Sequence, residues 1–168
     1  MPNPFFTRFA ANLVFAASSF VAHDALAQCA DGLSGRHGWW SGNTHHLTGS
    51  YHGSDWRVRP GVDAPGYMLY GPYDTRFGQG AHKADYYLQV DDNTTARNRV
   101  IASLKVYARQ GGRILAQRDL TRRDFLAANS WQFFTLHFEN PCFEQVETAI
   151  YWHGNAQLLF GQVFIEKQ

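Results

Sequence analysis

Charged residues are scarce in this sequence: Asp, Glu, Lys and Arg make up 17% of its 168 residues and leave a formal net charge of +1. Nucleic acid and anionic lipid are bound by strongly basic surfaces, so this near-neutral balance predicts no nucleic-acid partner. The chain also lacks a Gly-x-Ser-x-Gly elbow, a phosphate-binding glycine loop and a His-Glu-x-x-His pair. Because it contains no fixed-period repeat, low-complexity tract or Pro/Ser-rich linker either, we expect a single folded domain.

The N-terminal segment has the pattern of an export signal. Arg8 precedes an apolar run over residues 9–22, and Ala25-Leu-Ala27 supplies the small residues that signal peptidase requires. The run is too short for an ordinary membrane-spanning helix, so we expect no transmembrane segment after cleavage. The pattern predicts a cleaved signal peptide over 1–27, a single domain over 28–168, and a secreted or periplasmic location.

Cysteine is also rare, with Cys29 and Cys142 as the only two. In an oxidising compartment such a pair usually oxidises, so we predict a Cys29–Cys142 disulfide. In the chain-entropy model, closing a loop of roughly 110 residues stabilises the fold by about 4–5 kcal/mol. A lipid-modified Cys29 is the alternative, although Gln28 stands where a small residue is expected.

Glycine and aromatic residues are abundant, and the apolar residues alternate with polar ones in short segments. Over 99–108, for example, Leu104 and Val106 fall on one face, with Lys105 and Tyr107 on the other. The region 30–65 is typical of loops and short edge strands, and Thr121 and Asp124 have the spacing of a helix cap, which predicts a short helix over 122–128. The connections are too short for helical crossovers, so the pattern predicts an all-β antiparallel β-sandwich of the jelly-roll type with about eight strands. The longer strands are expected over 66–73, 82–91, 99–108, 113–120, 131–138, 146–152 and 157–166.

Several of these segments resemble a known family of folds. The string GYMLYGPY over 66–73, the rhythm of 86–90, 100–106 and 112–120, and the closing IYWHG over 150–154 are similar to galactose-binding-domain-like β-sandwiches of bacterial carbohydrate-binding modules. The resemblance covers roughly residues 45–166. It implies a β-sandwich that binds a glycan or polysaccharide, or structural calcium, without catalysing a reaction.

A sugar site needs aromatic rings that stack on sugar faces, beside side chains that donate to or accept from hydroxyls. Trp40, Trp56, Tyr73 and Trp152 lie within two residues of a Gly, Pro, His or Asp and are candidates for binding, whereas Tyr86, Phe133, Phe138, Phe160 and Phe164 are expected to fill the core. We predict Trp56, Tyr73 and Trp152 as stacking residues, with His46, Asp74 and His153 as their hydrogen-bonding partners.

Metal binding is the next alternative. His37, His45, His46, His52 and His153 offer nitrogen ligands, but adjacent histidines in an extended segment face opposite ways, so we expect no metal in the binding site. The loop Asp91-Asp92-Asn93 has oxygen ligands that suit calcium without the fuller pattern of a calcium loop. Two alternatives stay open for this loop: a structural calcium site or a solvated turn.

Two other functions remain as alternatives. Exposed Trp and Tyr residues are also good anchors for protein interfaces, so the chain could be an interaction or inhibitor module that binds another exported protein. A small hydrolase is the weaker alternative, because a glycosidase needs two carboxylates at a defined separation and no local motif marks such a pair.

Overall fold

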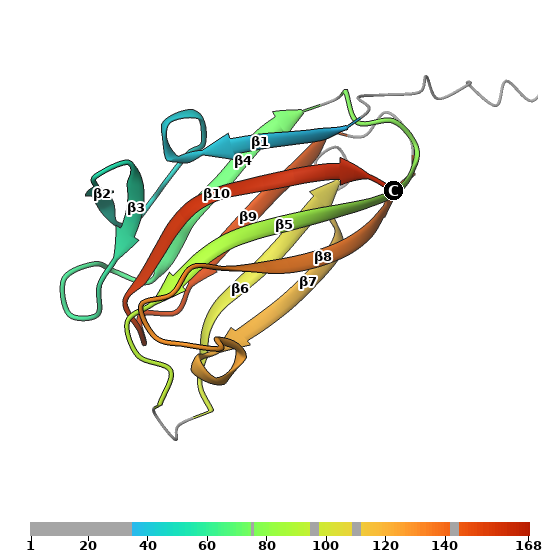
Figure 1. The fold of residues 1–168 in the computed structure, drawn as a ribbon. Helices are drawn as coiled ribbons and strands as arrows, with labels where there is room; N and C mark the ends of the chain where they lie inside the picture. Colours follow the sequence, from blue (N-terminus) through green and yellow to red (C-terminus); the bar gives the residue numbers. More distant parts are fainter. Residues whose placement is uncertain (1–34, 75, 95–97, 109–111, 142–144) are drawn as a thin grey trace, which may run out of the picture.

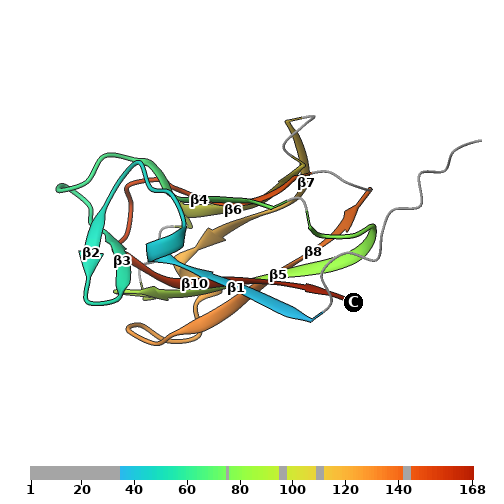
Figure 2. The ribbon, with the colours of Figure 1, turned by 90° about the horizontal axis from the view of Figure 1, so that it is seen from above.

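The chain folds into two antiparallel β-sheets that pack face to face (Figures 1 and 2). The computed structural model describes residues 35–74, 76–94, 98–108, 112–141 and 145–168. Its ten strands are β1 (Arg36–Trp40), β2 (Ser50–His52), β3 (Asp55–Val58), β4 (Gly66–Asp74), β5 (Gly80–Val90), β6 (Val100–Ala108), β7 (Arg113–Thr121), β8 (Gln132–Asn140), β9 (Val146–Trp152) and β10 (Leu158–Lys167).

The larger sheet has the order β2-β3-β10-β5-β8, and the smaller one has the order β4-β9-β6-β7. β10 pairs with β5 along one edge; along its other edge it pairs with β3 over 158–160 and with β1 over 162–166. The prediction of an all-β antiparallel sandwich is confirmed. The strands number ten rather than about eight because the region expected to hold loops and short edge strands supplies three of them.

The core lies between the sheets and follows the alternation of the sequence. Tyr86, Phe138 and Phe160 are buried there as predicted. Phe133 is not: it is 48% exposed, because β8 turns the neighbouring Phe134 inward instead. Phe164 is only partly buried as well, since Val163 and Ile165 take the inward positions of β10, so the prediction that these two phenylalanines fill the core is wrong.

The predicted helix over 122–128 is wrong in length and type. Only a 3-10 turn forms, over Arg122–Asp124. The cap itself is present: the Asp124 carboxylate accepts hydrogen bonds from the Thr121 backbone N–H at 2.7 Å and from its hydroxyl at 2.8 Å. The turn ends at Phe125, which adopts an extended backbone and places its ring in the core.

One glycine is required by a close approach. Gly49 has a φ of +97°, and a Cβ at this position would lie 2.5 Å from the Arg57 carbonyl oxygen and 2.6 Å from the Trp56 indole nitrogen. The chain before β2 can therefore cross β3 at this distance only without a side chain.

Residues 1–27, Cys29 and Cys142 lie outside the described residues, so the export signal and the disulfide stay predictions. Within the described ranges, no helix has the length and apolar character needed to span a bilayer.

Candidate functional site

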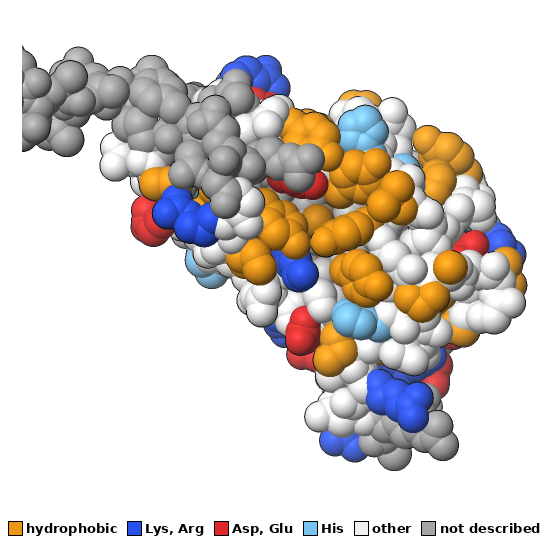
Figure 3. Space-filling view, turned by 180° about the vertical axis from the view of Figure 1, so that it is seen from behind, with side chains coloured by type: hydrophobic (Ala, Val, Ile, Leu, Met, Phe, Trp, Pro, Cys, Tyr) orange, Lys and Arg blue, Asp and Glu red, His pale blue; other side chains and the backbone are white. Residues whose placement is uncertain are grey.

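A row of tyrosines covers the outer face of the smaller sheet. A pocket of about 410 Å³ opens there, and the space-filling view from this side shows hydrophobic side chains gathered over the middle of the face with histidines among them (Figure 3). We call this pocket the tyrosine groove. It is lined by Leu47, Tyr67, Tyr70, Tyr73, Tyr107, Gly112 and Glu147.

Strand register explains why these residues meet. Side chains alternate across a regular strand, but β4 has a register shift between Tyr67 and Leu69. Because of this shift, Met68 and Leu69 are both buried while Tyr67 and Tyr70 face outward. On the neighbouring strands, Tyr67 lies opposite Tyr151 of β9, and Glu147 of β9 lies opposite Tyr107 of β6.

Ala149 occupies the middle of the face, between Tyr70 on β4 and Lys105 on β6. It is only 1% exposed, yet it does not belong to the core cluster between the sheets. The hydroxyls of Tyr67 and Tyr107 lie 3.5 Å apart although their strands are separated by β9. A methyl group at position 149 therefore lets the two phenols reach each other across β9.

The wall of the groove comes from the segment before β2, which runs beside β4. His45 exchanges two backbone hydrogen bonds of 2.9 Å with Tyr70, and the Leu47 N–H donates to the Tyr67 carbonyl at 2.8 Å. The His45 ring then lies 5.2 Å from the Tyr70 ring and 5.9 Å from the Tyr73 ring. Leu47 and the tyrosines of β4 are thus held on one side of the pocket.

The rings form a continuous series. Tyr70 lies 6.5 Å from Tyr73 and 6.3 Å from Tyr67, and Tyr67 meets Tyr151 edge to face at 5.3 Å. Tyr151 in turn meets the His153 ring at 5.1 Å. Edge-to-face contacts at these distances are favourable, and they hold the rings in fixed orientations.

Polar groups border the same face. The Ser103 hydroxyl donates to the Asp119 carboxylate at 2.6 Å, and the Nε2 atom of His153 lies 2.9 Å from the Ser103 oxygen. Because the serine proton is directed to Asp119, Nε2 is the donor to the serine. In a hydrolytic triad the imidazole accepts the serine proton and the carboxylate contacts the imidazole. This arrangement therefore positions His153 and does not activate Ser103.

At the centre of the tyrosine groove lies the Tyr67 hydroxyl. The hydrogen bond with Tyr107 raises the pKa of Tyr67, and partial burial raises it further. The Tyr67 phenol is therefore a stable O–H group that can donate to, or accept from, a ligand hydroxyl.

Two of the six predicted site residues belong to this face. Tyr73 lines the groove, and His153 extends the series of rings beyond Tyr151. Trp56 and His46 lie together elsewhere, stacked at 3.8 Å. The Trp56 N–H donates to the Thr48 carbonyl at 2.7 Å, and both His46 nitrogens lie within hydrogen-bonding distance of backbone oxygens. This pair packs the segment before β2 against β3.

The remaining two predicted residues are buried. Trp152 is 0% exposed and its indole N–H donates to the Ala156 carbonyl at 2.8 Å, so its faces are covered and the prediction of a stacking role is wrong. Asp74 is 7% exposed, and Arg76 donates to both of its carboxylate oxygens. Burial disfavours the charged form of Asp74, but the side-chain and backbone hydrogen bonds from Arg76 outweigh it and lower the pKa. Its oxygens are thus occupied by Arg76, and Asp74 does not line the groove.

Sequence reasoning did not select Tyr67, Tyr107, Tyr151 and Glu147. The signal was present in part, since Tyr107 falls on the outward side of its strand in the alternation over 99–108. The sequence pattern did not predict that β9 pairs between β4 and β6, and this pairing brings the four side chains together.

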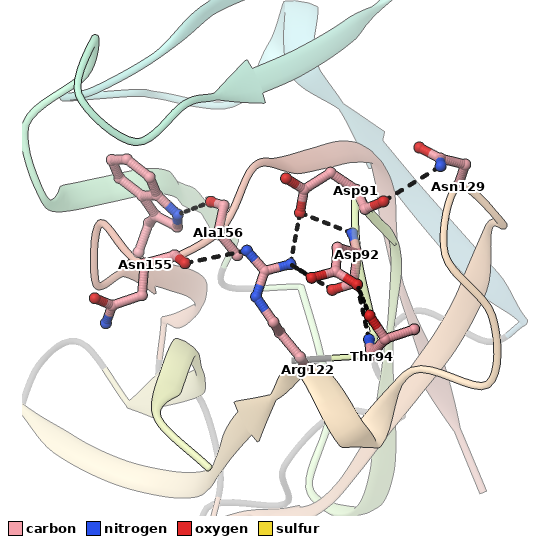
Figure 4. A network of polar contacts seen from close by, with 8 residues as sticks. Asp91, Asp92, Thr94, Arg122, Asn129, Asn155 and Ala156 are labelled. Atoms are coloured by element: carbon pink, nitrogen blue, oxygen red, sulfur yellow. Dashed lines mark hydrogen bonds and ion pairs between the residues drawn. The ribbon is translucent and has the colours of Figure 1, made fainter. Parts of the chain in front are cut away.

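The acidic loop Asp91-Asp92-Asn93, considered above for calcium, is contacted by a cationic side chain of the protein itself, that of Arg122 (Figure 4). The Arg122 guanidinium donates to the Asp91 carboxylate at 2.8 Å and lies 3.6 Å from that of Asp92. It also donates to the backbone carbonyls of Asp92 and Asn155, so it joins the loops after β5 and β9 to the end of β7. Within the described ranges, no three His, Cys, Asp or Glu side chains cluster as metal ligands.

Comparison with known proteins shows the fold. No family model matches the chain, and no curated protein does. Among solved structures, the C-terminal family 6 carbohydrate-binding module of a laminarinase from Zobellia galactanivorans superposes with a TM-score of 0.50 at 8% identity, covering 79% of this chain and all of that one. The predicted likeness to the β-sandwich of carbohydrate-binding modules is confirmed.

Two further structures are similar at lower scores. A xylanase fragment from Clostridium thermocellum, with a family 22 module and its catalytic module in complex with xylohexaose, has a TM-score of 0.44 at 12% identity, over 82% of this chain and 27% of that one. A family 6 module of a Cellvibrio mixtus lichenase, in complex with cellotriose, has a TM-score of 0.40 at 13% identity, over 84% and 95% of the two chains.

Proposed function

We propose that this chain is a non-catalytic carbohydrate-binding domain of an exported protein and that it binds a glycan in the tyrosine groove. The observation that carries the proposal is the series of tyrosine rings on the smaller sheet, bordered by hydrogen-bonding groups on the same face.

The chemistry of a sugar suits this surface. A pyranose ring presents C–H groups on its faces, which pack on aromatic rings, and hydroxyls on its rim, which need oriented donors and acceptors. The groove offers the rings of Tyr67, Tyr70 and Tyr107 and their hydroxyls, and the largely buried Glu147 carboxylate lies beside them. In this proposal Tyr73 stacks on the sugar and His153 hydrogen-bonds to it, the roles expected from the sequence.

Binding without catalysis is supported by the composition of the groove. Hydrolysis of a glycosidic bond ordinarily requires two carboxylates on opposite sides of the bond. Of the described residues that line the groove, Glu147 alone is acidic. A protein interface would be expected to show a broader apolar patch, whereas this pocket combines rings with convergent polar groups.

Glycan binding is tested with the purified chain on a glycan array, with and without a chelator, followed by isothermal titration calorimetry with the glycans that bind. We expect binding that the chelator does not abolish. Tyr73→Ala and Tyr107→Ala should each weaken it by about 1–3 kcal/mol, a roughly 5- to 150-fold rise in Kd. Tyr107→Phe keeps the ring and should cost less.

The matched control is Tyr51→Ala, which removes a tyrosine that is 58% exposed on β2, away from the groove. Denaturant unfolding of each variant separates loss of binding from loss of fold. An array without any glycan signal would refute the proposal. So would groove variants that are folded and bind the selected glycan as tightly as the unchanged protein.

Export and the disulfide belong to the same proposal and have their own measurement. The intact mass of the protein recovered from the producing cell should correspond to a chain beginning at Gln28. Thiol titration in denaturant should then find no free thiol until a reductant is added.

A further inference from the structure

A second group of aromatic side chains lies on the outer face of the larger sheet. Tyr87 stacks on Trp131 at 4.8 Å and on Phe133 at 4.6 Å, and Phe133 lies 6.1 Å from Phe164. Together with Trp40, which is 57% exposed, these residues form what we call the aromatic shelf. Its strands, β1, β10, β5 and β8, are on the near side of the molecule in Figure 1.

Core packing does not account for the shelf. In three of the four contributing strands an adjacent aromatic already fills the inward position, Trp39 beside Trp40, Tyr86 beside Tyr87 and Phe134 beside Phe133, and in β10 Val163 and Ile165 do so beside Phe164. The outward partners therefore add aromatic surface to the outer face, exposed at Trp40 and Phe133. At the far end of the shelf the Arg36 guanidinium lies 3.9 Å from the Phe164 ring centroid and 5.4 Å from that of Phe133. Contiguous exposed apolar surface of this kind is typical of binding sites.

The shelf borders a pocket of about 330 Å³ between β1, β10 and the start of β8. Gly161 forms its floor, because a Cβ there would lie 3.2 Å from the Tyr87 ring and 3.3 Å from the Trp131 ring. The glycine lets both rings lie close to the strand. The lining residues are Trp40, Ser54, Asp55, Tyr87, Trp131, Gly161 and Gln162.

Polar groups of the pocket have unused hydrogen-bonding capacity. Within the described part of the chain, the side chains of Asp55, Gln162 and Trp131 make no hydrogen bond or ion pair. They offer a carboxylate acceptor, an amide that donates and accepts, and an indole N–H donor. A site with flat rings and both kinds of polar group matches a ligand that has apolar faces and a rim of hydroxyls.

We infer that the aromatic shelf is a second carbohydrate-binding site, opposite the tyrosine groove, and that the chain holds two polysaccharide segments at once. The ligand class rests on the proposed function. The sheets pack face to face, so their outer faces point in opposite directions (Figure 2). One glycan segment cannot occupy both sites of one protein molecule without wrapping around the sandwich. Each protein molecule therefore binds two polysaccharide segments and bridges them.

Tryptophan fluorescence distinguishes the two sites. The groove is lined by tyrosines, whereas the shelf contains Trp40 and Trp131. We expect a hexasaccharide to shift the tryptophan emission of the unchanged protein and of the groove variant Tyr107→Ala. The shift should disappear in the shelf variant Trp40→Phe/Trp131→Phe. Cellohexaose, xylohexaose and the strongest array glycan serve as probes.

Stoichiometry and bridging complete the test. Calorimetry should find two hexasaccharides per chain in the unchanged protein and one in Trp40→Ala/Trp131→Ala. In Tyr107→Ala one of the two should bind with an unchanged Kd and the other with a Kd roughly 5- to 150-fold higher. Light scattering of the corresponding soluble polysaccharide should rise with the unchanged protein and with the control Leu126→Ala, whose side chain is 91% exposed elsewhere. It should not rise with either single-site variant.

The outcomes separate the two proposals. Shelf variants that keep the stoichiometry and the scattering of the unchanged protein would overturn the second site and leave the groove intact. Shelf variants that change only the elution volume in gel filtration would overturn it in favour of self-association. An unchanged protein that binds no probe would refute the proposed function itself.

Discussion

Replacing Arg122 with methionine would remove the cation that joins three loops and keep the apolar stem of the side chain. The guanidinium contacts the Asp91 carboxylate and the backbone carbonyls of Asp92 and Asn155, and the Arg122 side chain is only 12% exposed. Without it, the Asp91 and Asp92 carboxylates lose the positive charge that both of them contact, and their mutual repulsion is no longer offset. We expect the loops after β5 and β9 to separate from the end of β7 before the sheets unfold.

The size of the effect follows from the burial of the partners. Breaking a fully buried ion pair by removing one member costs about 3–5 kcal/mol, and a hydrogen bond to a charged group contributes about 1.5–3 kcal/mol. The Asp91 and Asp92 side chains are 36% and 40% exposed, so water replaces part of what is lost. We expect Arg122→Met to lower the free energy of unfolding by about 2–4 kcal/mol and the Tm by about 5–15 °C.

Urea unfolding followed by tryptophan fluorescence measures this loss. Arg122→Lys is the matched control: it keeps the charge but lacks the planar fork that reaches several oxygens, so it should recover less than half of the stability. Added calcium should raise the unfolding midpoint of Arg122→Met and leave that of the unchanged protein in place. A methionine variant within about 0.5 kcal/mol of the unchanged protein would refute the reasoning, as would equal calcium stabilisation of both.

Three further predictions concern stability. Burial lowers the pKa of His82, so the unfolded chain takes up a proton that the folded chain excludes. The free energy of unfolding should therefore fall as the pH drops below about 6.5. Urea midpoints measured across this pH range should fall less steeply for His82→Phe. Trp152→Ala should cost about 3–5 kcal/mol in urea unfolding while the folded fraction keeps its glycan Kd, because Trp152 is a core residue; a lower affinity at full folding would contradict this. Gly49→Ala should lower the Tm and cost roughly 2 kcal/mol or more, because the new Cβ meets the Arg57 carbonyl; an unchanged Tm would show that β3 can move away.

Local patterns in the sequence were sufficient for the architecture. Alternation over each strand decides which side chains face the other sheet, and that depends only on the period of the backbone. The bounds of β9 over 146–152 agree with the sequence prediction, and those of β4 and β7 differ from it by one residue. The outward orientation of Tyr107 could be predicted for the same reason.

The binding face itself was decided by tertiary structure. Tyr67, Tyr107 and Tyr151 are far apart in the sequence and meet only because β9 pairs with β4 on one edge and with β6 on the other. Trp152 was misjudged for the complementary reason: it sits on the inward side of β9, and its N–H bonds to the Ala156 carbonyl, which closes the interior over it. Strand alternation assigns a residue to a face, but the partners on that face depend on contacts between distant parts of the chain.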